Sequence, residues 1–569
     1  MRWHWITGPA ALAVVVTLAN AGKPVVVDDA AYLAYARQIA HHPLDPYGFD
    51  IFWYTVPLPA MEVLCPPVVP YWLAAGVRLF GDEPALLKLW LFPFVWLFAW
   101  SLAVLLRRFA RGADRATLLL VVLSPAVLPM VNLMLDIPAA ALGLAALVLF
   151  ARASDRGSWQ LAAAAGAVAA LAMQTKYTAL LVPPLLAWYG LTHRRLRLAA
   201  VAVGVSVVGF AAWEYALVQK YDRSHFLFHV NDQSAADGGG IAGFIHDKAP
   251  LAPALAAHLG CLAVGVGLYA GRAAGVPRRA LVAVAVVWVV GVGLVAALPY
   301  RDAILLAGKD DGRAKLTLAA TVWRTAGAGV LLTSAAAAGL LLVRFQRRPG
   351  LRRSADAWFV VGWVAIELAG YFVLTPFPAA RRVIGVTITL GVLAARVVSR
   401  VNRTDARRHP PRWVVPFGVA VGVLVAALDT FDAFPEKVIA ERAASVTSTQ
   451  GPGVKTWYVG HWGFQYYCER AGMRAVVPGQ SELAAGDLLV VPIFPKDKEF
   501  YRPDSFHARL ELPDDAVEQV EEIVWDDALS ARTIPSLYGG PDPITGRDHP
   551  RLRVGVFRIL RPWAVPRAR

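Results

Sequence analysis

Runs of apolar residues dominate the chain up to about residue 430 and predict membrane-spanning helices. The runs are about 17–25 residues long, the length of helix that crosses ~30 Å of hydrocarbon. We therefore expect a polytopic α-helical membrane protein with about 13 transmembrane helices. The runs fall near residues 5–22, 84–106, 116–133, 136–151, 159–174, 177–191, 198–218, 251–271, 280–299, 321–343, 355–375, 381–399 and 413–430.

Composition agrees with this pattern. Hydrophobic residues make up 57% of the chain and charged residues only 17%, which is too apolar for a soluble protein of this size. The net charge of +15 comes entirely from the first 430 residues, which carry 39 basic and 22 acidic groups, against 17 and 19 in the remainder. The basic residues cluster in short loops between apolar runs, which is typical of membrane topology, so the charge does not indicate nucleic acid as a partner.

Arginine-rich loops predict the orientation of the helices. Every second connection is rich in arginine, and arginine-rich loops stay in the cytoplasm. This parity predicts a cytoplasmic N-terminus and places segments 23–83 and 219–250 on the outer face. The abundance of Ala, Arg and Val favours a bacterium of high genomic GC, and so an inner (plasma) membrane location.

The composition changes near residue 430 and predicts two domains, a transmembrane domain over 1–430 and a soluble extracytoplasmic α/β domain over 431–569. Within the second domain, residues 454–459, 487–491 and 554–560 are expected to be strands. Residues 462–471 are expected to form a helix, and 516–523 are read as a second one.

The first outer loop, 23–83, opens with an acidic pair, Asp28 and Asp29, followed by Tyr32. Residues 30–41 and 71–81 have the amphipathic pattern of helices that lie in the membrane interface. A carboxylate beside another carboxylate, partly removed from water, can act as a general base. The simpler alternative is that Asp28 caps the helix that follows it.

Four further charged residues are expected on the same face. Asp136 interrupts an apolar region, where an ionisable side chain usually has a function, although it too could cap a helix. Lys176, followed by Tyr177, could bind an anion or simply reach the membrane surface. Arg381 and Arg382 oppose the topology rule, which favours an anionic ligand such as phosphate.

These motifs, taken in order, resemble those of GT-C glycosyltransferases of the protein O-mannosyltransferase and lipid A aminoarabinose transferase type. The resemblance rests on the Asp-Asp-x-x-Tyr start of the first loop, the run from Pro66 to Leu73 with Leu79-Phe80-Gly81, and the charged positions just named. It implies transfer of a sugar from a polyprenyl-phosphate carrier to a glycolipid, protein or polysaccharide acceptor outside the membrane, with inversion.

By the same resemblance, Asp28 would be the general base, and Asp29 and Asp136 would position the acceptor or tune that base. Lys176 with Arg381 or Arg382 would neutralise the departing lipid phosphate. Two positions depart from the usual motifs. Glu62 is displaced from the double proline, and the late arginine motif reads Arg381-Arg382-Val383-Ile384-Gly385.

A divalent metal is possible but not specified, since His225 and His229 read more readily as part of a solvated loop. In the tail, residues 460–467 are dense in aromatic side chains, which could hold a sugar acceptor or pack against their own sheet. The competing functions are a membrane transporter or flippase and a glycan polymerase or ligase. A transporter would be expected to show repeated halves with polar residues at mid-membrane.

Overall fold

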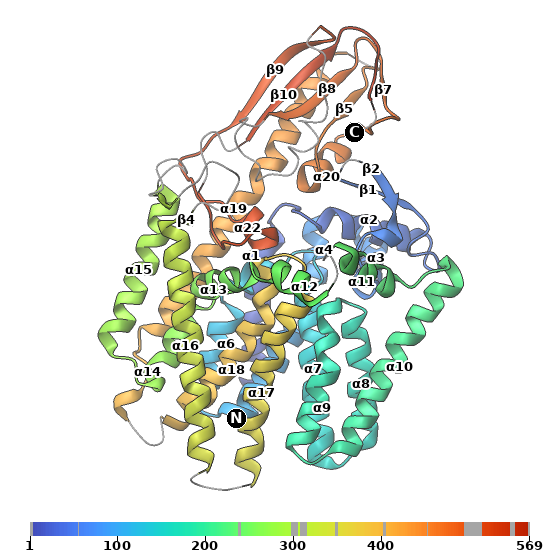
Figure 1. Cartoon of the computed structure of the whole chain (residues 1–569). Coiled ribbons are helices and arrows are strands. Elements are labelled where there is room, and N and C mark those ends of the chain that lie inside the picture. The colour runs from blue at the N-terminus through green and yellow to red at the C-terminus, as the bar shows by residue number, and fades with distance from the viewer. Residues whose placement is uncertain are drawn as a thin grey trace.

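A computed structural model of the chain describes residues 4–54, 56–236, 240–297, 305–307, 316–346, 351–401, 406–451, 453–493, 515–546 and 552–566. It has a helical bundle at one end and a sheet at the other (Figure 1). Helix α1, His4–Ala21, begins at the end of the bundle away from the sheet. The protein is an integral membrane protein, because its bundle consists of long apolar helices.

Eight helices of the described chain are long and apolar enough to cross a membrane, and a ninth span exists if a bent pair is counted as one. The bent pair consists of Ile245–Leu262, which contains α13 (Leu251–Leu262), and α14 (Val264–Ala274), and the two meet at 86°. The eight spans are Pro84–Ala110 (α4, Pro84–Trp90, with α5, Phe92–Ala110), α7 (Asp136–Arg156), α10 (Leu196–Tyr221), α15 (Arg278–Ala297), α16 (Leu318–Gln346), α17 (Leu351–Leu374), η4 with α18 (Ala380–Val383 and Ile384–Val401) and α19 (Val414–Ser448).

The remaining apolar runs form shorter helices, so the expected count of thirteen is not reached by helices of full length. Run 177–191 is divided into a 3-10 turn and a helix of 11 residues. The shorter elements are α1, α6 (Asp114–Val122), α8 (Trp159–Met173), η3 (Tyr177–Leu181), α9 (Val182–Thr192), α11 (His225–Ala236), α12 (Gly240–Lys248) and the 3-10 turns η2 (Leu128–Met130) and η5 (Ala406–Arg408).

The prediction of a helix over 116–133 is wrong for its second half, because α6 ends at Val122. The chain then runs irregularly through Pro125 and Pro129, which lack the N–H group that a helix needs. Irregular backbone at this depth is stable where protein surrounds it. Here Asn20 donates to the Leu128 carbonyl at 2.8 Å.

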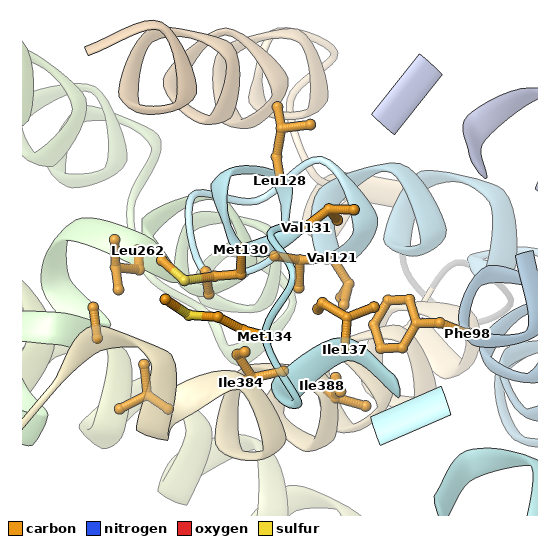
Figure 2. Packing of buried hydrophobic residues seen from close by; sticks show 14 of the residues in the cluster. Phe98, Val121, Leu128, Met130, Val131, Met134, Ile137, Leu262, Ile384 and Ile388 are labelled. Carbon is orange, nitrogen blue, oxygen red and sulfur yellow. The ribbon is translucent and has the colours of Figure 1, made fainter. Parts of the chain in front are cut away.

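Figure 2 shows this irregular segment buried among apolar side chains of α5, α7, α13 and α18. Met130 and Met134 lie beside Leu262 and Ile384. The packing fixes the position of the residue that follows, Asp136, where α7 starts.

The first loop contains the two helices expected there, α2 (Asp29–His41) and α3 (Val68–Phe80). Between them lie a hairpin, β1 (Asp50–Trp53) with β2 (Val56–Pro59), and a 3-10 turn, η1 (Ala60–Glu62). Both helices lie at the end of the bundle that faces the sheet (Figure 1).

The C-terminal region contains a five-stranded mixed sheet in the order β6-β5-β8-β10-β9. The three expected strands and the helix over 462–471 are confirmed. Residues 516–523 were expected to be helical, but they belong to strand β9, which pairs with β10 in antiparallel register. Long-range pairing overrides the local pattern of this acidic segment. The elements are β5 (Thr456–Tyr458), α20 (Trp462–Arg470), β6 (Arg474–Ala475), β7 (Glu482–Leu483), β8 (Leu488–Ile493), β9 (Val517–Trp525), α22 (Ile534–Gly539), β10 (Leu552–Ile559) and β11 (Trp563–Ala564); a separate pair, β3 (Leu305–Ala307) with β4 (Leu316–Thr317), lies beside α16.

The change of composition at residue 430 falls inside α19, a helix of 35 residues. The helix continues from the bundle to the sheet without a break in secondary structure (Figure 1). The two expected domains therefore share one element.

Candidate active site

Asp28 lies directly before α2, at the end of the bundle that faces the sheet. It occupies the N-cap position, but its side chain makes no cap hydrogen bond. Its carboxylate accepts a hydrogen bond from Arg381 Nη1 at 2.7 Å. The preceding residue, Val27, has a positive φ of 45°, an unfavourable backbone conformation for a β-branched side chain. The Asp28 carboxylate therefore bonds to an arginine that is distant in the sequence, and it does not cap α2.

Asp136 and Lys176 form a second ion pair. Asp136 is the first residue of α7, and Lys176 directly precedes η3. The ion pair therefore links the start of α7 to the connection between α8 and η3. Both side chains are largely buried, at 7% and 13% exposure. Burial, together with Arg381 and Arg382 nearby, lowers the pKa of Lys176 to about 7, while Asp136 opposes the shift.

The two ion pairs belong to one site. Asp136 lies within electrostatic range of Lys176, Arg381 and Arg382. Tyr32, on the first turn of α2, is within range of Asp28, Asp136 and Arg381, and burial raises its pKa well above the usual value. Six of the residues singled out from the sequence therefore converge, namely Asp28, Tyr32, Asp136, Lys176, Arg381 and Arg382.

Arg382 differs from the other two cations. Among the described residues, no carboxylate forms an ion pair or hydrogen bond with it, and its guanidinium lies over the ring of Phe377 at 5.3 Å. Its Nε is buried without a hydrogen-bond partner. Arg381 and Lys176, by contrast, each contact an aspartate. A half-buried guanidinium that forms no ion pair with a carboxylate is a favourable place for an anion.

A groove leads away from this site between α7, α9, α17 and α18. It has an empty volume of about 910 Å³, part of it open to the surroundings. Asp136, Arg381 and Arg382 line it together with apolar side chains such as Leu144, Leu185 and Ile388. The groove also contains the carboxylate of Glu367, and Gly385 leaves the space for that side chain, since a Cβ there would lie 2.2 Å from Glu367 Oε2.

Asp29, although adjacent to Asp28, faces a different partner. Its side chain is fully buried, with Oδ2 4.0 Å from Lys88 Nζ, and Lys88 also donates to the Lys23 and Pro24 carbonyls. Burial raises the pKa of Asp29 to about 6, and the attraction of Lys88 and Lys23 opposes that rise. Asp29 thus helps to fix the start of α2.

Two of the other expected residues contact partners outside the cluster. The Tyr177 hydroxyl lies 2.6 Å from His225 Nδ1, on the side of α10 and α11. Glu62 accepts from Arg223 at 3.3 Å. These directions could not be predicted from the sequence, because adjacency along the chain does not determine where a side chain points.

The histidines of α11 are not in a solvated loop, which corrects that interpretation. His225 is 1% exposed and His229 8%, and their rings pack 4.5 Å apart. Within the described ranges, no group of three or more His, Cys, Asp or Glu side chains is placed to hold a metal ion. The divalent metal stays a possibility from the sequence alone.

Sequence reasoning missed a buried charged network beneath the site. Lys23 pairs with Asp429 of α19 and donates to the Tyr538 hydroxyl of α22 at 2.9 Å. Asp429 also accepts from Thr533 at 3.0 Å. The signal was available, because Lys23 ends one apolar run, Asp429 lies within another, and charges in such positions are costly unless paired.

A family model described as "Dolichyl-phosphate-mannose-protein mannosyltransferase" matches residues 65–214. The match includes Asp136, Lys176 and Tyr177, and it covers less than half of the chain. It confirms, over these residues, the resemblance predicted from the sequence. No curated protein matches the chain.

Three proteins are among those whose solved structures are similar to the chain. The archaeal oligosaccharyltransferase AglB from Archaeoglobus fulgidus, in complex with an inhibitory peptide and a dolichol-phosphate, is 14% identical, with a TM-score of 0.45 over 86% of this chain and 70% of that one. ArnT from Cupriavidus metallidurans, bound to undecaprenyl phosphate, is 16% identical, with a TM-score of 0.42 over 98% of both chains. The mycobacterial arabinofuranosyltransferase AftD is 14% identical, with a TM-score of 0.41 over 98% of this chain and 40% of that one. Because these values are low, we base the functional assignment on the chain's own residues.

Proposed function

We propose that the protein is a membrane glycosyltransferase that moves a sugar from a polyprenyl-phosphate carrier to an acceptor on the face of the membrane that bears the sheet. The observation that carries this proposal is the guanidinium of Arg382, which lines a largely apolar groove and forms no ion pair with a carboxylate among the described residues. A cation beside an apolar channel matches a lipid phosphate, which is an anionic head on a hydrocarbon tail.

In the proposed reaction, Asp28 removes the proton from the acceptor hydroxyl while that oxygen bonds to the anomeric carbon of the donor. The bond between this carbon and the phosphate oxygen breaks, and the electron pair leaves with the lipid phosphate. Attack opposite the phosphate inverts the anomeric configuration. Asp28 is suited to this role because its hydrogen bond with Arg381 holds the carboxylate in a fixed orientation.

The cations stabilise the departing phosphate. Arg382 is free to bind it directly, and Lys176 and Arg381 add positive charge from their ion pairs with Asp136 and Asp28. Positive groups held in place before the reaction stabilise charge that develops in the transition state. Asp136 therefore acts as a positioning residue for Lys176.

The location and orientation belong to the same proposal. Arginine-rich connections support a cytoplasmic N-terminus and an extracytoplasmic sheet. The abundance of Ala, Arg and Val supports a bacterial inner membrane. We retain 1–430 as the transmembrane domain and 431–569 as the extracytoplasmic domain, with α19 shared between them.

The alternatives are less well supported. A flippase or transporter places its polar residues near mid-membrane between repeated halves. Here the two ion pairs of the candidate site, Asp28–Arg381 and Asp136–Lys176, lie at the end of the bundle near the sheet. A glycan polymerase or ligase would use the same donor chemistry. The length of the transferred saccharide in the product distinguishes it from a transferase that moves a single sugar.

The direct test uses purified full-length protein in lipid nanodiscs with a panel of synthetic polyprenyl-phosphate sugars, and mass spectrometry of the products. We expect release of polyprenyl phosphate coupled to addition of one sugar to an acceptor from the native cell envelope. Binding of undecaprenyl phosphate, measured by native mass spectrometry, reports the donor site separately. Absence of both binding and turnover would contradict the proposal.

A further inference from the structure

Three rings, two from the first loop and one from the C-terminal region, are in contact near the active site. Trp53 and Tyr54, at the tip of the β1–β2 hairpin, contact His461, the residue that precedes α20. The ring centroids of Trp53 and Tyr54 lie 5.1 Å and 4.7 Å from that of His461. Tyr54 is 39% exposed, whereas His461 is only 6% exposed. The hairpin therefore offers open aromatic surface beside a buried imidazole.

Only one of the two ring nitrogens of His461 forms a hydrogen bond among the described residues. Nδ1 lies 2.8 Å from Gln465 Oε1, and Gln465 Nε2 donates to Glu469 Oε1 at 2.9 Å. The Gln465 amide thus presents its oxygen to Nδ1, so Nδ1 carries the proton and Nε2 is an acceptor. Nε2 is buried and has no hydrogen-bond partner among the described residues. A buried acceptor without a donor is unfavourable unless a ligand supplies one.

The position of His461 is fixed by the docking of α20 onto the first loop. The Val25 N–H donates to the Tyr467 hydroxyl at 2.9 Å, and α20 packs against α2 and α19. A Cβ at position 463 would lie 2.6 Å from the Val25 carbonyl oxygen, so the glycine allows this close approach. Val25 precedes Asp28 by three residues, which ties the rings to the catalytic loop.

Asp28 is also close enough to His461 to affect it electrostatically. Burial lowers the pKa of His461 to about 4, and the Gln465 hydrogen bond and the Asp28 carboxylate partly oppose this. The imidazole is therefore neutral near pH 7, and its vacant nitrogen accepts hydrogen bonds from hydroxyl groups.

We propose that His461, Trp53 and Tyr54 form the acceptor subsite and that the acceptor is a sugar. A sugar ring has apolar C–H faces, which pack on aromatic rings, and a rim of hydroxyls, one of which would donate to His461 Nε2. The inference rests on the proposed function. It adds that the sheet region completes the site and that the acceptor is a carbohydrate instead of a protein side chain.

The test measures sugar binding by the full-length protein in nanodiscs, using saturation-transfer NMR with the methyl glycosides of mannose, glucose, galactose and arabinofuranose. We expect the wild type to bind at least one of them. His461→Phe keeps the ring but removes the acceptor nitrogen, so affinity should fall about tenfold. His461→Gln returns an acceptor near the same position and should restore most of the affinity.

Arg470→Ala is the matched control. Arg470 is on the same helix and pairs with Glu83 at an exposed site, so this variant perturbs the docking of α20 without touching the rings. Sugar binding should be unchanged in it. Equal binding by the wild type and His461→Phe, or no binding of any of the four sugars by the wild type, overturns the inference.

Undecaprenyl phosphate binding, measured on the same samples, separates the two proposals. Lipid binding without sugar binding leaves the transferase proposal standing and removes the acceptor subsite. Sugar binding without lipid binding contradicts the transferase proposal, and it leaves His461, Trp53 and Tyr54 as a sugar-binding site that is not an acceptor subsite. Binding of a serine- or threonine-containing peptide that competes with no sugar would assign the subsite to a protein acceptor and would also contradict the inference.

Discussion

Asp28 and Arg381 are hydrogen-bonded at 2.7 Å although 353 residues separate them in the chain. This contact joins the first loop, 23–83, to the turn η4 directly before α18, and it brings the expected base together with an expected phosphate ligand. The Asp28 side chain is only 17% exposed and that of Arg381 7%, so the pair lies in an environment where charge interactions are strong.

Replacing Asp28 by Asn should abolish sugar transfer while the protein stays folded and inserted, because the amide cannot accept the acceptor's proton. We expect a loss of at least about a hundredfold in turnover, the lower end of what general-base catalysis contributes. The measurement is product formation from a polyprenyl-phosphate sugar in membranes.

Asp82→Asn is the control, since Asp82 is a carboxylate of the same loop that pairs with Arg37 at the exposed surface. It should retain turnover. Normal transfer by Asp28→Asn would remove Asp28 from the mechanism.

Replacing Arg382 by Ala should weaken binding of undecaprenyl phosphate by about tenfold or more, the usual cost of losing a hydrogen bond to a charged group. Native mass spectrometry or a lipid competition assay would measure it. Arg37→Ala, which removes an exposed arginine of the first loop, should bind the lipid normally. If Arg382→Ala binds the lipid as well as the wild type, the groove is not the donor site.

The pKa of Lys176, lowered to about 7, predicts an alkaline limit to activity. The ammonium is protonated below that pH and neutral above it, so kcat/KM should fall as pH rises through about 7. This parameter reports ionisations of the free enzyme. Lys176→Arg keeps its charge at all accessible pH values and should remove the alkaline limb. An unchanged limb in that variant would assign it to another group.

The sequence was enough to predict which residues form the site, but it was not enough to predict which of them pair with each other. Asp136 stood out because an ionisable residue in an apolar region usually has a function. Arg381 and Arg382 stood out because they oppose the positive-inside pattern. Their common face followed from helix parity. Which cation meets which carboxylate did not follow, because it depends on helix packing between segments hundreds of residues apart.

Irregular structure was the other limit. The run 116–133 has the composition of a membrane helix, and its second half is nevertheless irregular. Hydropathy reports burial, and the segment from Leu123 to Leu135 is buried by protein. Only the prolines at 125 and 129 marked it as non-helical. The acidic strand β9 escaped prediction because its stability comes from pairing with β10.

The Lys23–Asp429 pair predicts a large effect on stability. Both side chains are 0% exposed, so Lys23→Met leaves a buried carboxylate without its cation. Breaking a buried pair in this way typically costs about 3–5 kcal/mol. The thermal midpoint in nanodiscs should fall, and Lys23→Met combined with Asp429→Asn should recover part of the loss. A double variant less stable than either single one would contradict this account.

Cysteine labelling tests the orientation. The three native cysteines, Cys65, Cys261 and Cys468, are free and buried, so they give little background. Cysteines introduced at Asp45 and at Arg408 should react with a membrane-impermeant maleimide from opposite sides. Reaction of both from the same side would contradict the assignment of the arginine-rich loops to the cytoplasm.

The length of α19 has a mechanical consequence. Its 35 residues extend about 50 Å at 1.5 Å per residue, well beyond ~30 Å of hydrocarbon. The length of α19 thus determines how far the sheet lies from the membrane surface. Inserting four residues near Ser445 would raise the sheet by about 6 Å and turn it by about 40°. Such an insertion would move His461 away from the Asp28 carboxylate. The length of α19 therefore sets the distance between these two side chains, and with it the space available to a substrate.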